Sequence, residues 1–180
     1  MKNKTCVKTE TDGQTAPGGE MSPATEAVRR SRVPLYRVVL ERSGSIVKEG
    51  AASATEPREA ARLFREFIGD APEEHFCLMV LDSRKRVIGI NEVSVGTLSA
   101  SLVHPREVFR AAILLNGAAI IVAHNHPSGD PYPSQEDKEV THRLRRAGEL
   151  LGIPLADHIV LGEASVDGLR SFSFRQHGLL

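Results

Sequence analysis

The chain has 180 residues, of which 41% are hydrophobic, 4% aromatic and 26% charged, and its formal net charge at pH 7 is zero. This length fits one domain with room for a tail, and the neutral balance gives no electrostatic footprint of a nucleic-acid binder. No run approaches the roughly 20 apolar residues of a membrane span, and no apolar core follows the charged N-terminus as in a signal peptide. Cys6 and Cys77 are far apart in sequence, so we expect no disulfide framework and a cytoplasmic location.

The N-terminal part of the chain divides into a tail and the start of a folded domain. Residues 1–33 are rich in Thr, Gly, Pro, Ser, Lys and Glu, and this composition predicts a disordered tail. The folded domain is expected over residues 34–180 and begins with a strand over residues 35–40. The sequence Thr55-Glu56-Pro57 is typical of a helix start, with Thr55 as the N-cap and the proline in the first turn.

Strand and helix patterns alternate through the rest of the chain. Apolar runs predict strands over residues 76–81, 87–95, 118–123, 153–161 and 172–174. The first two should form an antiparallel hairpin, and helical spacing predicts helices over residues 105–115 and 134–151. The last helix is expected to bury Val140, Leu144, Ala147, Leu150 and Leu151. This order of elements predicts an α/β domain with a mixed sheet flanked by helices.

The stretch from His124 to Asp137 carries the strongest chemical signal. It follows the apolar run that ends at residue 123, and side chains two apart on an extended segment point to the same face. His124 and His126 can therefore aim their imidazoles at one point, while Asn125 points away. Asp137 adds a carboxylate in the first turn of the next helix. Two histidines and one carboxylate leave a fourth tetrahedral position open, which is the catalytic arrangement of zinc.

The same residues also have a simpler interpretation. A His-x-His pair is by itself a weak signal for a metal. Ser134-x-x-Asp137 resembles a helix capping box, although Glu or Gln is the usual fourth member. In that case Asp137 would only mark the start of a helix.

The complete spacing resembles a known signature. His124-x-His126, seven residues, Ser134, two residues and Asp137 match the metalloprotease motif of the JAB/MPN (JAMM) domain. The longer string His-Asn-His-Pro-Ser-Gly-Asp-Pro-x-Pro-Ser is similar to the RadC branch of that superfamily, and the resemblance covers roughly residues 54–178. It implies a JAB/MPN metalloprotease-like fold, which resembles the cytidine deaminase fold in outline.

The resemblance also implies an activity. It indicates a zinc-dependent metallopeptidase or isopeptidase that uses a metal-activated water to hydrolyse a bond in a protein or peptide substrate. His124, His126 and Asp137 would be the metal ligands, with Zn²⁺ as the cofactor. Ser134 would stabilise the oxyanion of the tetrahedral intermediate, although the same hydroxyl is also needed to cap the helix.

A zinc hydrolase further needs a general base for its water. In the family this glutamate stands just before an apolar strand, and Glu74 aligns best with that position. Glu73 is the fallback, and Glu92 and Glu107 are weaker candidates. Between the histidines Asn125 replaces the Ser or Thr that eukaryotic members often have, which puts their ubiquitin-removing specificity in doubt.

Alternatives of other classes stay open. One is a DNA-repair-associated accessory protein, although the first 50 residues are too short and too rich in Gly and Pro for the helix-hairpin-helix region of full-length RadC proteins. Another is a catalytically silent MPN scaffold, although silent members usually lack the ligands kept here. His158 either supports the metal site or only starts a strand. The substrate, the oligomeric state and a choice between zinc, iron and manganese are not determined by the sequence.

Overall fold

The computed structural model describes residues 34, 37, 40–46, 54, 56–96, 103–165 and 168–180. The helices are α1 (Pro57–Ile68), α2 (Pro105–Leu114) and α3 (Gln135–Leu151). The strands are β1 (His75–Leu81), β2 (Val87–Val95), β3 (Ala119–Asn125), β4 (Leu155–Ser165) and β5 (Gly168–Ser173). The predicted disordered tail over residues 1–33, and most of the predicted strand over residues 35–40, lie outside the described residues.

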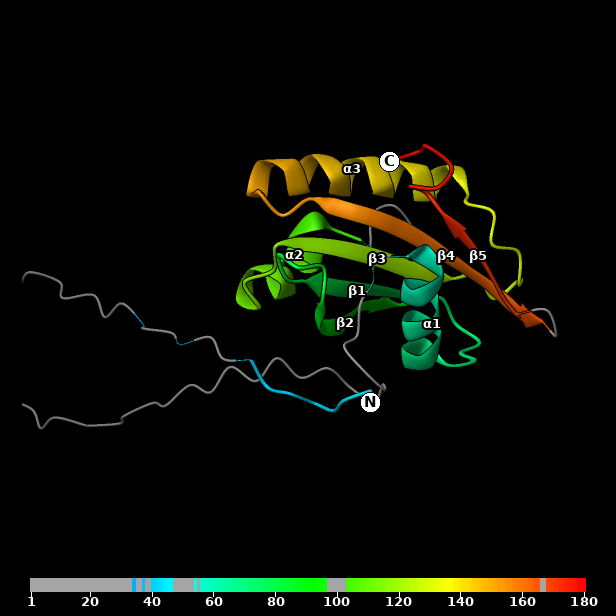
Figure 1. Cartoon of the computed structure of the whole chain (residues 1–180), viewed down its shortest axis with the longest axis horizontal. Coiled ribbons are helices and arrows are strands. Elements are labelled where there is room, and N and C mark those ends of the chain that lie inside the picture. The colour runs from blue at the N-terminus through cyan, green and yellow to red at the C-terminus, as the bar shows by residue number, and fades with distance from the viewer. Residues whose placement is uncertain are drawn as a thin grey trace, which may run out of the picture. The chain divides into compact units, whose positions relative to one another are not determined.

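The five strands form one mixed sheet in the order β2-β1-β3-β4-β5 (Figure 1). β1 pairs antiparallel with both β2 and β3, which confirms the predicted hairpin. β4 pairs parallel with β3 and antiparallel with β5. A parallel pair needs a crossover connection, and α3 provides it. The predicted α/β class, a mixed sheet flanked by helices, is therefore confirmed.

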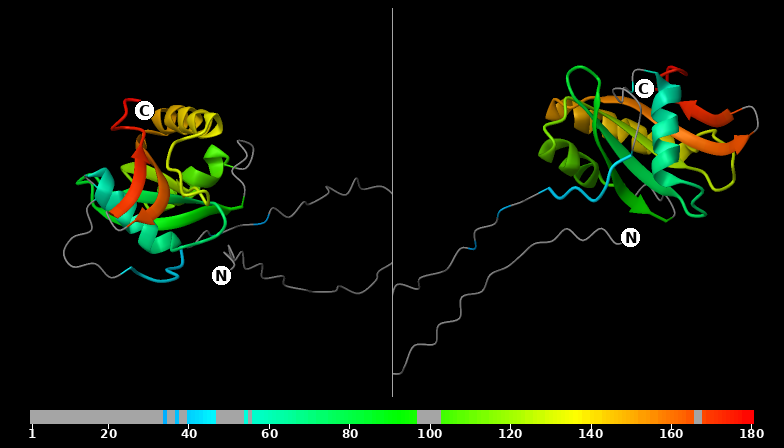
Figure 2. Two further views of the ribbon diagram at one scale, coloured as in Figure 1. Left: turned by 90° about the vertical axis from the view of Figure 1, so that its right-hand side faces the viewer. Right: turned by 60° about the horizontal axis from the view of Figure 1, so that its bottom comes forward.

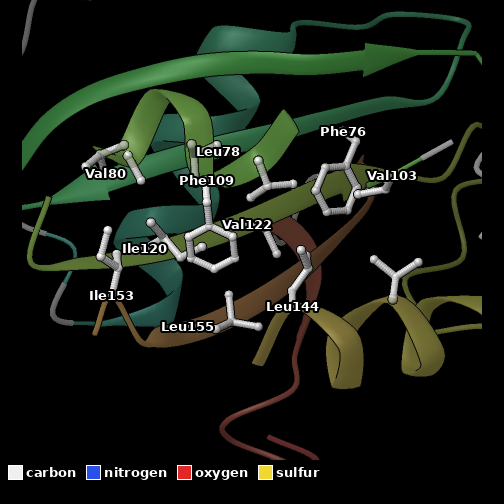
Figure 3. Close-up of a cluster of buried hydrophobic side chains, with 13 residues drawn as sticks. Phe76, Leu78, Val80, Val103, Phe109, Ile120, Val122, Leu144, Ile153 and Leu155 are labelled. Carbon is white, nitrogen blue, oxygen red and sulfur yellow. The ribbon is translucent and has the colours of Figure 1, made fainter. Parts of the chain in front are cut away.

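Helices cover both faces of the sheet, with α1 on one face and α2 and α3 on the other (Figures 1 and 2). Side chains alternate along β1, so Phe76 and Leu78 pack toward α2 and α3, while Cys77 and Met79 pack toward α1. Figure 3 shows the cluster on the α2 and α3 face, where Phe109 from α2 lies over the strands. All of β1 beyond its first residue is buried, because neither face of this strand meets solvent.

The buried face of α3 differs from the prediction at its C-terminal end. Val140 and Leu144 are buried as predicted and Ala147 packs against the core. Leu150 is 88% exposed and Leu151 is 46% exposed, and the helix meets the core there through Gly148. A Cβ at Gly148 would lie 2.6 Å from the carbonyl oxygen of Ile153, so the loop before β4 approaches the helix closely there. Each residue turns a helix by about 100°, so Leu150 lies on nearly the opposite side from Gly148.

The start of α1 also differs by one residue. Glu56, not Thr55, occupies the N-cap position, and it makes no side-chain capping bond. Pro57 takes the first helical position, where a proline has no amide hydrogen to leave unpaired. Among the helices that the structure describes, none is both long and apolar enough to cross a membrane.

Candidate metal centre

Four side chains converge where β1 begins, β3 ends and α3 begins. The ligand atoms of Glu74, His124, His126 and Asp137 all lie within 4.8 Å of one another. Nε2 of His124 is 3.0 Å from Nε2 of His126 and 3.2 Å from Oδ1 of Asp137. Two tetrahedral zinc ligands, each about 2.0–2.1 Å from the ion, lie roughly 3.3 Å apart. The spacing therefore suits a small divalent cation.

The end of β3 positions both histidines. His124 is fully buried and stacks on Phe76 of β1, its partner in the ladder, with ring centroids 6.1 Å apart and an interplanar angle of 11°. His126 follows the last residue of β3, but its N–H still donates to the carbonyl oxygen of Leu161 in β4 at 2.9 Å. The backbone thus stays paired with β4 for one residue beyond the end of β3, and the two histidine rings meet at their Nε2 atoms.

Asp137 is both a helix cap and a member of this cluster. Its Oδ2 accepts hydrogen bonds from the N–H of Ser134 at 2.7 Å and from the Ser134 hydroxyl at 2.6 Å. The Ser134 Oγ in turn accepts from the N–H of Asp137 at 3.1 Å, which completes a capping box. The two interpretations left open by the sequence therefore do not compete. The capping box fixes the carboxylate, and its other oxygen, Oδ1, faces His124.

The partners behind His124 determine which of its nitrogens carries the proton. The Thr141 hydroxyl donates to the carbonyl oxygen of Asp137 at 2.6 Å, so its oxygen must accept the proton on Nδ1 of His158, also at 2.6 Å. Nε2 of neutral His158 then carries a lone pair, and it accepts from Nδ1 of His124 at 2.9 Å. Nε2 of neutral His124 is therefore left with a lone pair directed into the cluster.

A hydrogen bond also determines which nitrogen of His126 carries the proton. Its Nδ1 lies 2.7 Å from the carbonyl oxygen of Asp130, which can only accept, so Nε2 of the neutral ring again carries the lone pair. Two ring nitrogens without protons and one carboxylate thus face one another at contact distance. Three acceptors in this arrangement repel one another unless a cation lies between them. The donor set fits a site that could hold a metal ion.

Without a metal ion, a proton on one of these ring nitrogens would relieve the repulsion by bonding to Asp137. Burial alone would raise the pKa of Asp137, but hydrogen bonds with His124 and His126 outweigh it and hold this pKa well below its usual range. The hydrogen bond to Asp137 raises the pKa of His126. Burial lowers the pKa of His158 well below its usual value, so its ring is neutral at pH 7. A proton and a metal ion would therefore compete for the same nitrogens.

Of the four candidate glutamates, the structure brings Glu74 to the cluster, with Oε1 3.9 Å from Nε2 of His124. Glu73 is exposed and outside the cluster. Glu92 pairs with His75 at 2.8 Å, and Glu107 pairs with arginines on α2. Glu74 also lines a hollow of about 320 Å³ that opens to solvent. The other residues around this hollow are His126, Pro127, Ser128, Ser134, Glu136 and Asp137.

Sequence reasoning left two contributions to this site unrecognised. Thr141 has no motif of its own, and only the folded structure brings it against His158. Asn125 was expected to point away from the metal, and in the structure its amide binds the segment that carries Glu74. The contact of Thr141 depends on how α3 packs on β4, and that of Asn125 depends on the register between β1 and β3, and a single sequence contains neither.

A mixed sheet flanked by helices, with this cluster at one end, defines a JAB-like domain with side chains able to hold a metal ion. The chain belongs to the RadC-like JAB domain family, whose profile matches residues 54–179. The resemblance to the RadC branch noted in the sequence is thereby confirmed.

Curated relatives carry the name UPF0758 protein. The relative from Desulforudis audaxviator is 43% identical over 150 residues, which is 83% of this chain and 64% of the relative. The relative from Desulfitobacterium hafniense is 40% identical over 168 residues, or 92% and 66% of the two chains. The relative from Clostridium kluyveri is 52% identical over 106 residues, or 59% and 46%. The chain therefore spans about half to two thirds of the length of these relatives.

Proposed function

We propose that this chain is a zinc-dependent metallopeptidase or isopeptidase, with His124, His126 and Asp137 as the metal ligands. The observation that carries the proposal is the proton order of the cluster. In their neutral forms, both Nε2 atoms present lone pairs, 3.0 Å apart, beside an ionised carboxylate. The membership of the chain in the RadC-like JAB family supports the same reading.

Zinc bound there would supply a Lewis acid that lowers the pKa of water from 15.7 toward about 7 and polarises a carbonyl oxygen. Glu74 would take the proton from the attacking water and pass it to the departing amine. Ser134 would donate its hydroxyl proton to the developing oxyanion. Because this hydroxyl donates to Asp137 in the resting structure, it must turn toward the substrate during the reaction.

The surroundings of the cluster favour a polymeric substrate. The hollow beside Glu74 is open to solvent rather than enclosed, and a chain could therefore lie across it with one carbonyl at the metal. Peptide and isopeptide bonds need the same core residues, so the proposal covers both.

The test is hydrolysis by the full chain loaded with one equivalent of zinc. The substrates are a library of internally quenched peptides and a matching set of peptides joined through lysine Nε. We expect cleavage of at least one member, lost in Glu74→Gln although that variant still binds zinc. Glu73→Gln is the matched control, because Glu73 is the neighbouring exposed acid, and it should keep full activity.

Other outcomes favour the alternatives. A zinc-loaded chain that cleaves nothing in either set would favour a silent scaffold. Salt-sensitive DNA binding in a gel shift would favour an accessory role in DNA transactions. Full activity of Glu74→Gln would remove Glu74 from the role of base.

A further inference from the structure

The side chain of Asn125, which stands between the two histidines, contacts the segment that carries Glu74. Its Oδ1 accepts a hydrogen bond from the N–H of His75 at 2.8 Å. Its Nδ2 donates to the carbonyl oxygen of Glu73 at 2.9 Å and to that of Ala71 at 3.4 Å. The two shorter bonds go to the peptide groups on either side of Glu74, so a single amide brackets that residue.

These bonds continue a backbone ladder that stops one residue earlier. β1 and β3 pair antiparallel as far as Phe76 and His124, and the next residue of β3 is Asn125. The backbone beyond it pairs with β4 instead, where the N–H of His126 donates to a carbonyl oxygen at 2.9 Å. A side-chain amide offers the same kind of donor and acceptor as a peptide group. The Asn125 side chain therefore replaces the backbone pairing that β3 no longer provides to β1.

The bracket leaves little freedom for the backbone of Glu74. Its carbonyl oxygen accepts from the N–H of Gly96 at 2.9 Å, on the side of the segment that faces the end of β2. Asn125 holds the other side and is only 3% exposed. The amide fits in one orientation alone, because the N–H of His75 can only donate and the carbonyl of Glu73 can only accept. Held from both sides, the segment directs the Glu74 carboxylate into the cluster.

We propose that Asn125 is a positioning residue for Glu74: by bonding the peptide groups on both sides of it, the amide holds the carboxylate 3.9 Å from Nε2 of His124. The inference rests on the proposed function, because the position of this carboxylate matters only if Glu74 acts beside a metal. A displacement of about 1 Å is enough to lower a rate roughly 10²-fold. Asn125 acts only through Glu74.

Three variants of the full chain test this inference. Asn125→Ala removes both arms of the bracket. Asn125→Asp keeps an acceptor for the N–H of His75 but replaces the donor with an oxygen that repels the Glu73 carbonyl. Asn91→Ala is the matched control, since Asn91 is half-buried in β2 and donates one side-chain bond to a carbonyl oxygen at 3.0 Å.

Two readouts are needed, and neither requires a substrate. The first is hydrogen exchange of the His75 amide, followed by NMR without metal. The second is the visible absorption of the chain loaded with Co²⁺, which reports the groups around the ion, with Glu74→Gln as the reference. Co²⁺ affinity is measured in parallel to show that the metal ligands are intact.

Asn125→Ala is expected to speed exchange at His75 about tenfold or more and to shift the Co²⁺ spectrum as Glu74→Gln does, with Co²⁺ affinity nearly unchanged. Asn125→Asp should shift the spectrum in the same direction, and it carries the test if the alanine variant does not fold. Asn91→Ala should change neither readout. Unchanged exchange, or wild-type spectra in both Asn125 variants beside a shifted Glu74→Gln spectrum, would overturn the inference.

Failure of the proposed function has a different signature. In that case the wild-type chain binds no Co²⁺, or Glu74→Gln leaves the spectrum unchanged. Exchange at His75 needs no metal, so it decides by itself whether Asn125 holds this segment.

Discussion

Nδ1 of His124 lies 2.9 Å from Nε2 of His158, and this contact joins two fully buried rings on neighbouring parallel strands. His158 is itself fixed by packing, because its ring lies against Phe76, with centroids 5.7 Å apart, and against Phe174 at 4.8 Å. It therefore acts as a rigid acceptor behind His124. The contact sets the tautomer of neutral His124 and so directs its lone pair toward the candidate metal centre.

Replacing His158 should weaken metal binding without removing a ligand. We expect His158→Ala to lower zinc affinity about 10- to 100-fold, the usual effect of losing a partner behind a metal-binding histidine. The measurement is competition with a chromophoric chelator at pH 7.5. His142→Ala is the control, because His142 is an exposed histidine on α3. Equal affinities in wild type and His158→Ala would show that the ring does not order His124.

Thr141 should matter for stability through its hydroxyl. Thr141→Val keeps the shape but leaves Nδ1 of His158 without its acceptor, and the Asp137 carbonyl oxygen loses its bond from the hydroxyl. A buried polar group without a partner costs about 1–3 kcal/mol, and we expect a loss of that size in urea unfolding. Thr141→Ser keeps the hydroxyl and should lose much less. Equal stability of the two variants would contradict the hydrogen-bond order behind His124.

Ser134 allows capping and catalysis to be separated. Ser134→Ala removes a capping side chain and should cost about 0.5–2 kcal/mol of stability, whereas glycine at an N-cap costs only a few tenths. Both variants lose the hydroxyl and should keep zinc, because no ligand changes. If Ser134 stabilises the oxyanion, Ser134→Gly should be nearly as inactive as Ser134→Ala although it is more stable. Full activity of Ser134→Gly would leave the serine with its capping role alone.

Much of the fold follows from local patterns. The hairpin of β1 and β2, the strand β3 and the long helix α3 were all predicted, because apolar runs and helical spacing are local properties. The exposure of Leu150 and Leu151 on α3 was not predicted, since Gly148 meets the core there and no hydrophobic pattern marks a glycine as buried. The N-cap of α1 was predicted one residue too early, because the helix starts at Pro57 without a capping side chain.

In the candidate site, too, the residues that are close in sequence were predicted and the contacts between distant residues were not. His124, His126 and Asp137 lie within 13 positions of one another, so their spacing alone suggested a cluster. His158 lies 34 positions beyond His124, and Asn125 lies 50 positions beyond the amide that it accepts from. Those contacts depend on the register of three strands, which is fixed by tertiary packing rather than by local sequence.

The buried thiol of Cys77 should make the stability of the fold depend on pH, independently of the candidate metal centre. Burial, with a smaller contribution from the charge of Glu92, raises the pKa of the Cys77 thiol from its ordinary value of 9.0 to about 12. Between these values the unfolded chain releases the proton and the folded chain keeps it, so the contribution is intact below pH 9 and is lost as the pH rises toward 12. The loss amounts to about 1.4 kcal/mol per pH unit.

The measurement is urea unfolding at pH 8 and pH 10.5 for wild type and Cys77→Ala. Stability should fall less steeply with pH in the variant, because the titrating thiol is gone. Other groups that titrate in this range are shared by both chains and cancel in the comparison. Equal slopes would show that Cys77 ionises in the folded chain as easily as in the unfolded one.

The most direct test of the metal centre is the zinc content of freshly purified, untagged chain, measured by elemental mass spectrometry beside Asp137→Ala. We expect about one zinc per chain in the wild type, since three ligands can hold one tetrahedral ion. The variant should lose that zinc and should not regain it on reconstitution. A wild-type chain that holds no metal, either as purified or after reconstitution with zinc, would contradict the site. His124 to Asp137 would then be a capped helix start with two loop histidines.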